Sequence, residues 1–298
     1  MEVVQTCDAC GAVLDGNRVP GMAEVSLAQC ACGLVITSPR PAVSEIAAYY
    51  PPTYYSYTPT APSVTRRLVD KVKEYKGGYP SQDGFLGRAF WGASAALLRQ
   101  LFLFHLPHQG ENQRLLEIGC GSGLNLRWAK EHGWDVYGLE LSERAVAEAN
   151  RQGFSNVRCA NIEDADFPSG FFDAVLMYHT LEHLYSPSAA IRRSYEILRP
   201  KGTLLVGVPK FDSWPRHISG KFWAHLDLPR HLHHFTQPVL LRLIRDSGFE
   251  VREVRLSSKL ISFYFTVRTL KRAGQLKRIF TRPQGTLSDV MLVVAEKP

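Results

Sequence analysis

The chain has 298 residues, of which 45% are hydrophobic and 21% charged, and its formal net charge is +7. This composition is typical of a globular protein with room for one large core and an appendage. No apolar run reaches the roughly 18–20 residues that a membrane-spanning helix needs. The N-terminus, MEVVQTCDAC, has no basic flank before an apolar segment. We therefore expect no signal peptide and a cytoplasmic location.

Four of the six cysteines lie near the N-terminus in two close pairs, Cys7 with Cys10 and Cys30 with Cys32, and a glycine follows each pair. Such knuckles resemble a zinc ribbon, in which four thiolates hold a tetrahedral ion and replace a core too small to form unaided. The second pair is one residue shorter than the usual C-x2-C, so its turn must differ. We expect a zinc-ribbon-like module over residues 1–40, with two disulfides or metal-free thiols as the alternatives.

A segment rich in tyrosine and proline follows the cysteines. Prolines bracket a short helix expected over 44–50, and the tyrosines beyond it favour packing against the main domain over a free linker. The spacing of apolar residues predicts two longer helices, at about 64–76 and 87–104. We therefore treat residues 41–109 as a connecting region with its own helices.

The stretch RLLEIGCGSG, residues 114–123, is the most informative in the chain. It is predicted to be a buried strand that ends at Glu117, followed by a turn with Gly119, Gly121 and Gly123 and then a helix. Glycines let the backbone pass close to a ligand, and the helix directs its first N–H groups toward it. The dinucleotide spacing G-x-G-x-x-G/A fails here. The pattern E-x-G-x-G-x-G instead resembles the first motif of class I S-adenosylmethionine (SAM) methyltransferases.

The next elements follow in the order of that family, and the resemblance covers residues 110–258. A strand over 134–141 ends at Glu140, 23 residues past Glu117, about the distance at which an acid meets ribose hydroxyls. Ser142 is expected to cap the next helix. Further strands are expected near 157, and at 171–178, 197–209, 250–258 and 289–298.

The resemblance implies an α/β fold, a Rossmann-like seven-stranded core over 110–298 with insertions after strands 5 and 6, at about 209–236 and 259–287. It also implies that residues 41–109 form a helical lid over the cofactor. By the same resemblance, Asn161 faces the adenine amino group and the Ile162 backbone faces its ring nitrogen. The expected SAM-binding set is Glu117, Gly119, Gly121, Gly123, Glu140, Leu141, Asn161, Ile162, Tyr178 and His179.

The long connection after the fifth strand carries the clues to the acceptor. It contains the pattern W-x-x-x-D-x-P-R-H-L-x-x-F, residues 223–235. Together with the N-terminal cysteines, this pattern resembles a bacterial subgroup of SAM methyltransferases with a cysteine-rich module. Members of that subgroup are often associated with polysaccharide, lipid or natural-product biosynthesis.

Three residues are candidates for the chemistry. In the related sugar C-methyltransferases a histidine of this loop is the general base, and His231 aligns with it. Arg230 replaces the neighbouring glutamate, which leaves oxygen or nitrogen methylation open, and its guanidinium could hold a phosphate or carboxylate. His179, in the loop after the fourth strand, is the third catalytic candidate. Structural roles for His231, His233 and His234 are the alternative, and a histidine metal site is disfavoured because no acid stands at a helical ligand spacing.

Residues 258–282 form a basic stretch with large apolar residues, inserted where a short hairpin is normal. It could contact an anionic membrane surface, bind a phosphate-bearing substrate or form a dimer face. Oligomeric state stays open.

We expect SAM-dependent methyl transfer to a small or lipid-linked metabolite such as a sugar, with a structural zinc ion. The alternative is an RNA methyltransferase that uses the cysteine-rich module on RNA, which a pI near 9.1 favours weakly. A protein that binds SAM without catalysis is a third class.

Overall fold

The computed structural model describes residues 1–14, 19, 26–51, 64–79, 106–107, 113–257, 259–280 and 285–298. The helix expected over 87–104 and most of the Tyr/Pro-rich segment lie outside these residues. The helix expected near 64–76 is α1 (Val64–Gly77), and the one expected over 44–50 is a shorter 3-10 turn, η1 (Ile46–Tyr49).

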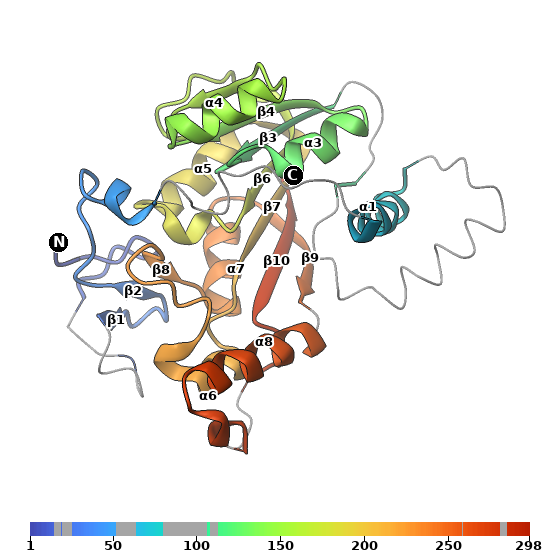
Figure 1. The fold of residues 1–298 in the computed structure, drawn as a ribbon. Helices are drawn as coiled ribbons and strands as arrows, with labels where there is room; N and C mark the ends of the chain where they lie inside the picture. Colours follow the sequence, from blue (N-terminus) through green and yellow to red (C-terminus); the bar gives the residue numbers. More distant parts are fainter. Residues whose placement is uncertain are drawn as a thin grey trace.

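A seven-stranded sheet forms the centre of the molecule, in the order β5-β4-β3-β6-β7-β10-β9 (Figure 1). Strand β10 is antiparallel to both of its neighbours, whereas the pairs among β3 to β7 are parallel. The seven strands are β3 (Arg114–Ile118), β4 (Asp135–Glu140), β5 (Val157–Cys159), β6 (Phe172–Tyr178), β7 (Leu198–Pro209), β9 (Glu250–Leu256) and β10 (Val290–Glu296). The predicted Rossmann-like seven-stranded fold is confirmed.

Both faces of the sheet are covered, because side chains of a strand alternate between them. Leu115 and Leu176 belong to one buried cluster together with Trp128 of α3. Leu116 and Met177, their neighbours in sequence, belong to the other. Long apolar runs in the central strands follow from this double burial.

The connecting helices are α3 (Leu124–Glu131), α4 (Glu143–Arg151), α5 (Pro187–Ile197) and α7 (Gln237–Asp246). Ser142 caps α4 as expected, since its Oγ accepts a hydrogen bond from the Ala145 N–H at 3.3 Å. Helix α1 is linked to the core by Tyr79, two residues after its C-terminus. Trp134 Nε1 donates a hydrogen bond to Tyr79 Oη at 2.7 Å. No helix among the described residues is long and apolar enough to cross a membrane.

A second, three-stranded sheet joins two distant parts of the chain. Strands β1 (Leu27–Gln29) and β2 (Val35–Thr37) come from the cysteine-rich region, and β8 (His233–His234) comes from the long loop after β7. Figure 1 shows β8 beside β2, next to α7. Cys7, Ile36 and Val239 of α7 belong to one buried cluster. The cysteine-rich module is therefore packed on the core through the loop that was expected to bind the acceptor.

The two inserted segments also meet each other. Helix α8 (Lys259–Arg272), with the turn η5 (Leu276–Phe280) behind it, lies between β9 and β10 in the chain. It packs on α6 (Trp214–Ser219), which precedes the turn η4 (Gly220–Phe222) in the loop after β7. Leu270, Trp214 and Ile218 form a small buried cluster. Each insertion thus supports the other at this end of the sheet.

Candidate functional site

The glycine-rich turn after β3 needs glycine at its ends. Gly119, Gly121 and Gly123 all have positive φ, at 72°, 53° and 87°, a region that side chains disfavour. A Cβ on Gly119 would lie 2.5 Å from Thr180 Oγ1, and one on Gly123 would lie 2.7 Å from Phe154 Cε2. The turn is therefore packed between the segments that follow β6 and α4, and a larger residue would displace it.

Glu117 is a buried acid with one oxygen unused. Its side chain is 3% exposed, and Oε1 accepts a hydrogen bond from Asn125 Nδ2 at 2.7 Å. Oε2 has no hydrogen-bond partner in the described part of the chain. Burial raises the pKa of Glu117 to about 8, against the lowering effect of the Asn125 hydrogen bond. Such a carboxyl favours a cationic ligand, and the amino group of SAM fits this requirement.

Glu140 lies at the end of the adjacent strand β4 and holds the same turn. Its carboxylate accepts hydrogen bonds from the N–H groups of Gly121 at 3.0 Å, Leu141 at 2.8 Å and Ser142 at 3.0 Å. Leu141 beside it is 65% exposed, so its side chain is accessible to a ligand. A ribose bound to Glu140 would therefore share its carboxylate with the three backbone N–H groups that it already holds.

The two residues expected to contact adenine are hydrogen-bonded to each other. Asn161 Oδ1 accepts a hydrogen bond from the Ile162 N–H at 2.8 Å. Both residues follow β5, next to the end of β4, so the structure brings them to the same edge of the sheet as Glu140. The Asn161 side chain would have to turn away from Ile162 before that N–H could serve a ring nitrogen.

Strand β6 ends beside the glycine-rich turn. Tyr178 is its last residue, and burial raises the pKa of the Tyr178 hydroxyl to about 12. His179 then has a φ of 55°, which is uncommon for a residue with a side chain. Its side chain is 27% exposed, and Nδ1 lies 3.3 Å from Glu182 Oε1. Because a carboxylate accepts, this contact places the proton on Nδ1 and the lone pair on Nε2.

His231 is placed deeper than His179. It is 6% exposed, its Nδ1 lies 2.9 Å from the His225 carbonyl oxygen, and its Nε2 lies 3.8 Å from Asp227 Oδ2. Burial lowers the pKa of His231 well below its usual range, and the neighbouring His183 adds to the effect. His231 is therefore a neutral ring among other histidines.

The Arg230 guanidinium is engaged within its own loop. It forms a two-pronged ion pair with Asp227, through Nε and Nη2, and Nη1 donates to the Tyr49 carbonyl oxygen at 3.1 Å. The sequence suggested that this fork could hold an acceptor phosphate or carboxylate. In the structure the fork is used on Asp227 and Nη1 links the loop to Tyr49, so an anionic acceptor would have to displace Asp227.

His233 and His234 form strand β8 and are fully enclosed. Burial lowers the pKa of His233 to about 4 and that of His234 to about 3. His234 Nε2 lies 3.2 Å from Thr37 Oγ1, which also donates to the His231 carbonyl oxygen at 2.6 Å. These two histidines hold the cysteine-rich module on the loop, which agrees with the structural role that the sequence left open for them.

The four N-terminal cysteines converge. Their sulfur atoms all lie within 4.8 Å of one another, and none of them is in a disulfide. In the two knuckles, the Gly11 N–H donates to the Cys7 carbonyl and the Gly33 N–H to the Cys30 carbonyl, each at 2.8 Å. The shorter second knuckle therefore closes through its own tighter turn. The arrangement suits a tetrahedral thiolate-bound ion.

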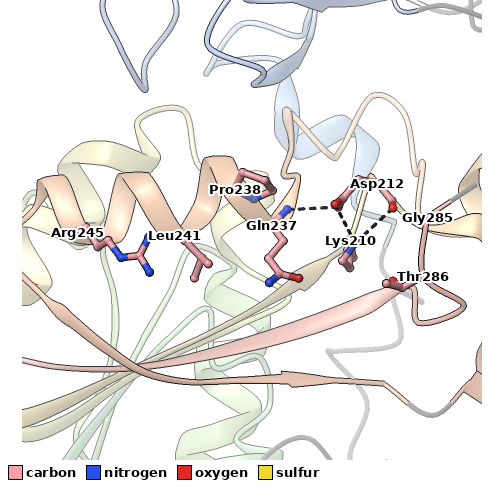
Figure 2. A pocket seen from close by; sticks show the side chains of 8 residues that line it. All are labelled: Lys210, Asp212, Gln237, Pro238, Leu241, Arg245, Gly285 and Thr286. Atoms are coloured by element: carbon pink, nitrogen blue, oxygen red, sulfur yellow. Dashed lines mark hydrogen bonds and ion pairs between the residues drawn. The ribbon is translucent and has the colours of Figure 1, made fainter.

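A cavity of about 460 Å³ lies past the end of β7 (Figure 2). Lys210 is buried there, and its Nζ lies 2.8 Å from Asp212 Oδ2. Asp212 also accepts a hydrogen bond from the Gln237 N–H at 3.2 Å. The lining residues are Lys210, Asp212, Gln237, Pro238, Leu241, Arg245, Gly285 and Thr286. None of the residues expected to bind SAM lines this cavity, so we do not assign the cofactor to it.

Comparison with known proteins identifies the family. A family model described as a methyltransferase domain matches residues 90–254, more than half of the chain. The chain therefore belongs to the methyltransferase-domain family. This membership supports SAM as the methyl donor.

Individual relatives differ in what they methylate. A ubiquinone biosynthesis O-methyltransferase of Cereibacter sphaeroides is 31% identical over 49% of this chain and 62% of its own length. Phosphoethanolamine N-methyltransferase 3 of Arabidopsis thaliana is 25% identical over 62% of this chain and 38% of its own. The chain thus spans less than two thirds of each of these relatives. A chain from the complex of the Haloferax volcanii Trm112 methyltransferase activator with a methyltransferase shares the fold, at a TM-score of 0.50 and 18% identity, covering 76% of this chain and 97% of that one.

The carboxyl of Glu117 should lose its proton when the cofactor binds. With a pKa of about 8, it is largely protonated at pH 6.5 in the free protein. S-adenosylhomocysteine, the product left after SAM gives up its methyl group, has the same ammonium group. This positive charge favours the ionised form of Glu117, so binding should release close to one proton at pH 6.5. Affinity should therefore rise with pH, by up to about tenfold per unit below pH 8.

Calorimetry in two buffers of different ionisation enthalpy measures the protons released. The Glu117→Gln variant keeps the shape of the side chain and should release almost none. Equal proton release from both proteins would show that Glu117 does not meet the ammonium group.

Proposed function

We propose that this chain transfers a methyl group from SAM to a small or lipid-linked metabolite, with a histidine as general base. The observation that carries the proposal is the position of His179, on the loop that packs against the Gly119 turn through Thr180. When bound, SAM supplies an electrophilic methyl group on its sulfonium. The protein then has to hold an acceptor atom in line with that methyl and remove its proton.

His179 is better placed for proton removal than His231. The Glu182 carboxylate orients its ring and leaves Nε2 as the basic nitrogen, the arrangement of an imidazole base supported by an acid. The ring is 27% exposed, so an acceptor can reach it. His231 is enclosed and its Nδ1 is held by the His225 carbonyl. We therefore propose His179 as the base in place of His231, the candidate from the sequence.

The acceptor class rests on chemistry rather than on a bound substrate. The relatives named above include an O- and an N-methyltransferase at similar identity, which supports an oxygen or nitrogen acceptor without choosing between them. Arg230 is paired with Asp227 and does not offer a ready phosphate site. We propose a metabolite whose methylated atom is a hydroxyl or amine that Nε2 of His179 can deprotonate.

We propose that Cys7, Cys10, Cys30 and Cys32 hold a structural zinc ion. Thiolates in this number and proximity suit zinc, and the buried Leu34 and Ile36 of the module belong to the apolar cluster of the main domain rather than to a separate core. Thr37, in the last strand of the module, donates its N–H to the Leu232 carbonyl at 2.9 Å. The ion would therefore stabilise the loop that carries His231 as well as the module itself.

We propose that α8 contacts an anionic lipid surface. Its buried residues, Ser262, Thr266 and Leu270, repeat every four positions and face the protein. The opposite side exposes Tyr264 and Phe265, 58% and 48% exposed, together with Arg268, Lys271 and Arg272. No acidic residue occurs between 259 and 280. Aromatic and cationic side chains on one face favour the interface of an anionic bilayer, which suits a lipid-linked acceptor.

The base is tested with His179→Ala. Turnover should fall by about 10²–10⁴-fold, far more than the affinity for S-adenosylhomocysteine falls, because proton removal is lost. Added imidazole should restore part of the rate. His217→Ala, which removes a half-buried histidine from α6, is the matched control. Full activity in His179→Ala would refute the assignment and return the role to His231.

The zinc ion is tested by elemental analysis of protein purified without chelators. One zinc per chain is expected, and Cys10→Ser should lose it, whereas Cys159→Ser, at another exposed cysteine outside the cluster, should keep it. In Cys10→Ser we expect lower activity and protease cleavage near the module, with nearly unchanged binding of S-adenosylhomocysteine. An absence of zinc from the parent protein, with four freely titrating N-terminal thiols, would contradict the site.

The lipid contact is tested by flotation with vesicles. Binding to phosphatidylglycerol vesicles should exceed binding to phosphatidylcholine vesicles, and replacing Arg268, Lys271 and Arg272 by Gln should weaken it tenfold or more. Replacing Arg144, Arg151 and Arg192 by Gln removes the same charge from other helices and should have little effect. Equal loss in both variants would indicate an unspecific charge effect. Salt-sensitive binding of RNA in place of vesicles would favour an RNA methyltransferase.

A further inference from the structure

We infer that Glu182, His183 and His231 form a second metal site, which takes a divalent transition-metal ion such as Zn²⁺. Their ligand atoms lie within 4.8 Å of one another. Glu182 and His183 belong to η3 (Leu181–His183), just after β6, and His231 precedes β8. Two imidazoles and one carboxylate are a ligand set that zinc accepts, with one position open to water or to a substrate atom.

Hydrogen bonds already orient both histidines as ligands. His183 Nδ1 lies 3.0 Å from the Arg230 carbonyl oxygen, and His231 Nδ1 lies 2.9 Å from the His225 carbonyl oxygen. A carbonyl oxygen only accepts, so each Nδ1 carries the proton and each Nε2 carries the lone pair. Metal-binding histidines are commonly held in this way, by a second hydrogen bond that fixes the tautomer.

Glu182 adds a carboxylate that has one oxygen without a hydrogen bond within the described residues. The side chain is 1% exposed, and Oε1 lies 3.3 Å from His179 Nδ1. Oε2 has no hydrogen-bond partner among the residues that the structure describes. A buried carboxylate oxygen without a partner is unfavourable, and a cation would satisfy it. The site therefore has the charge and the vacancy in hydrogen bonding that a metal ion would use.

Two loops bring the ligands together and are tied to each other. The Leu232 N–H donates to the Glu182 carbonyl oxygen at 2.8 Å, which fixes His231 beside η3. In a tetrahedral site, ligand atoms about 2.1 Å from a zinc ion lie about 3.4 Å apart. Ligand atoms as far apart as 4.8 Å must therefore draw together by about 1 Å when the ion binds. The sequence disfavoured a histidine metal site in this loop, and in the structure the acidic ligand, Glu182, comes from the other loop.

Such an ion would lie next to the proposed base. Glu182 would connect the two, with Oε1 toward His179 and Oε2 toward the metal. An acceptor hydroxyl on the open coordination position would lose its proton more easily. Binding of the ion itself does not depend on the proposed methyl transfer, and it is measured without any acceptor.

The test is the zinc stoichiometry of the full chain, after dialysis against micromolar free Zn²⁺. The parent protein should hold two zinc ions per chain, one on the cysteines and one here. Glu182→Gln and His231→Asn should each hold one, and His217→Asn, which removes a histidine elsewhere, should hold two. Cys10→Ser should also hold one, so that Cys10→Ser combined with His231→Asn holds none.

Cobalt substitution separates the two sites by spectrum. Co²⁺ on the cysteines gives a thiolate charge-transfer band, whereas Co²⁺ on Glu182, His183 and His231 should give visible bands without one. Binding of S-adenosylhomocysteine verifies that each variant is folded, and His183→Asn is used if Glu182→Gln does not fold. One zinc per chain in the parent, or two in His231→Asn, would overturn the inference.

Discussion

The parallel pairing of β3 with β6 is the constraint on which the site depends. β3 pairs with β4 on one side and with β6 on the other, and Ile118 lies opposite Met177. The glycine-rich turn and the His179 loop therefore leave neighbouring strands at the same level. In open α/β sheets, ligands bind at the carboxyl ends of the strands where the strand order reverses, and β3 and β6 lie at that point here. The gap between them is closed, since a Cβ on Gly119 would collide with Thr180. A shift of one residue in this register would turn every side chain of β6 to the wrong face.

The cysteine-rich module acts on the same end of the sheet through a different contact. Strand β8 has only two residues, and it is held by β2 and by the buried Thr37. Two residues cannot form a stable strand alone, so their conformation depends on the module. The loop that carries His231 is thus ordered from outside the methyltransferase core. A structural ion among the cysteines would therefore affect the acceptor side while leaving the residues around Glu117 untouched.

The core was predictable from sequence because its signals are local. The apolar run of β3, the three glycines and the Ser142 cap lie within 30 residues, and each specifies its own geometry. The acceptor side was not predictable from sequence, because its contacts join segments that are distant in the chain. Glu182 meets His231 across 49 residues of chain, and Arg230 uses its fork on Asp227 rather than on a ligand. A resemblance could align His231 with a known base, but only the packing of η3 against the loop shows that its ring is enclosed.

Two buried acids with an unused oxygen flank the predicted position of methyl transfer. Glu117 stands on the cofactor side at the end of β3, and Glu182 stands on the acceptor side just after β6. Neither oxygen stabilises the unliganded fold, because a buried polar atom without a hydrogen-bond partner costs free energy. An arrangement of this kind favours a protein whose stability increases when cations bind, an ammonium at one acid and, as we infer, a metal ion at the other.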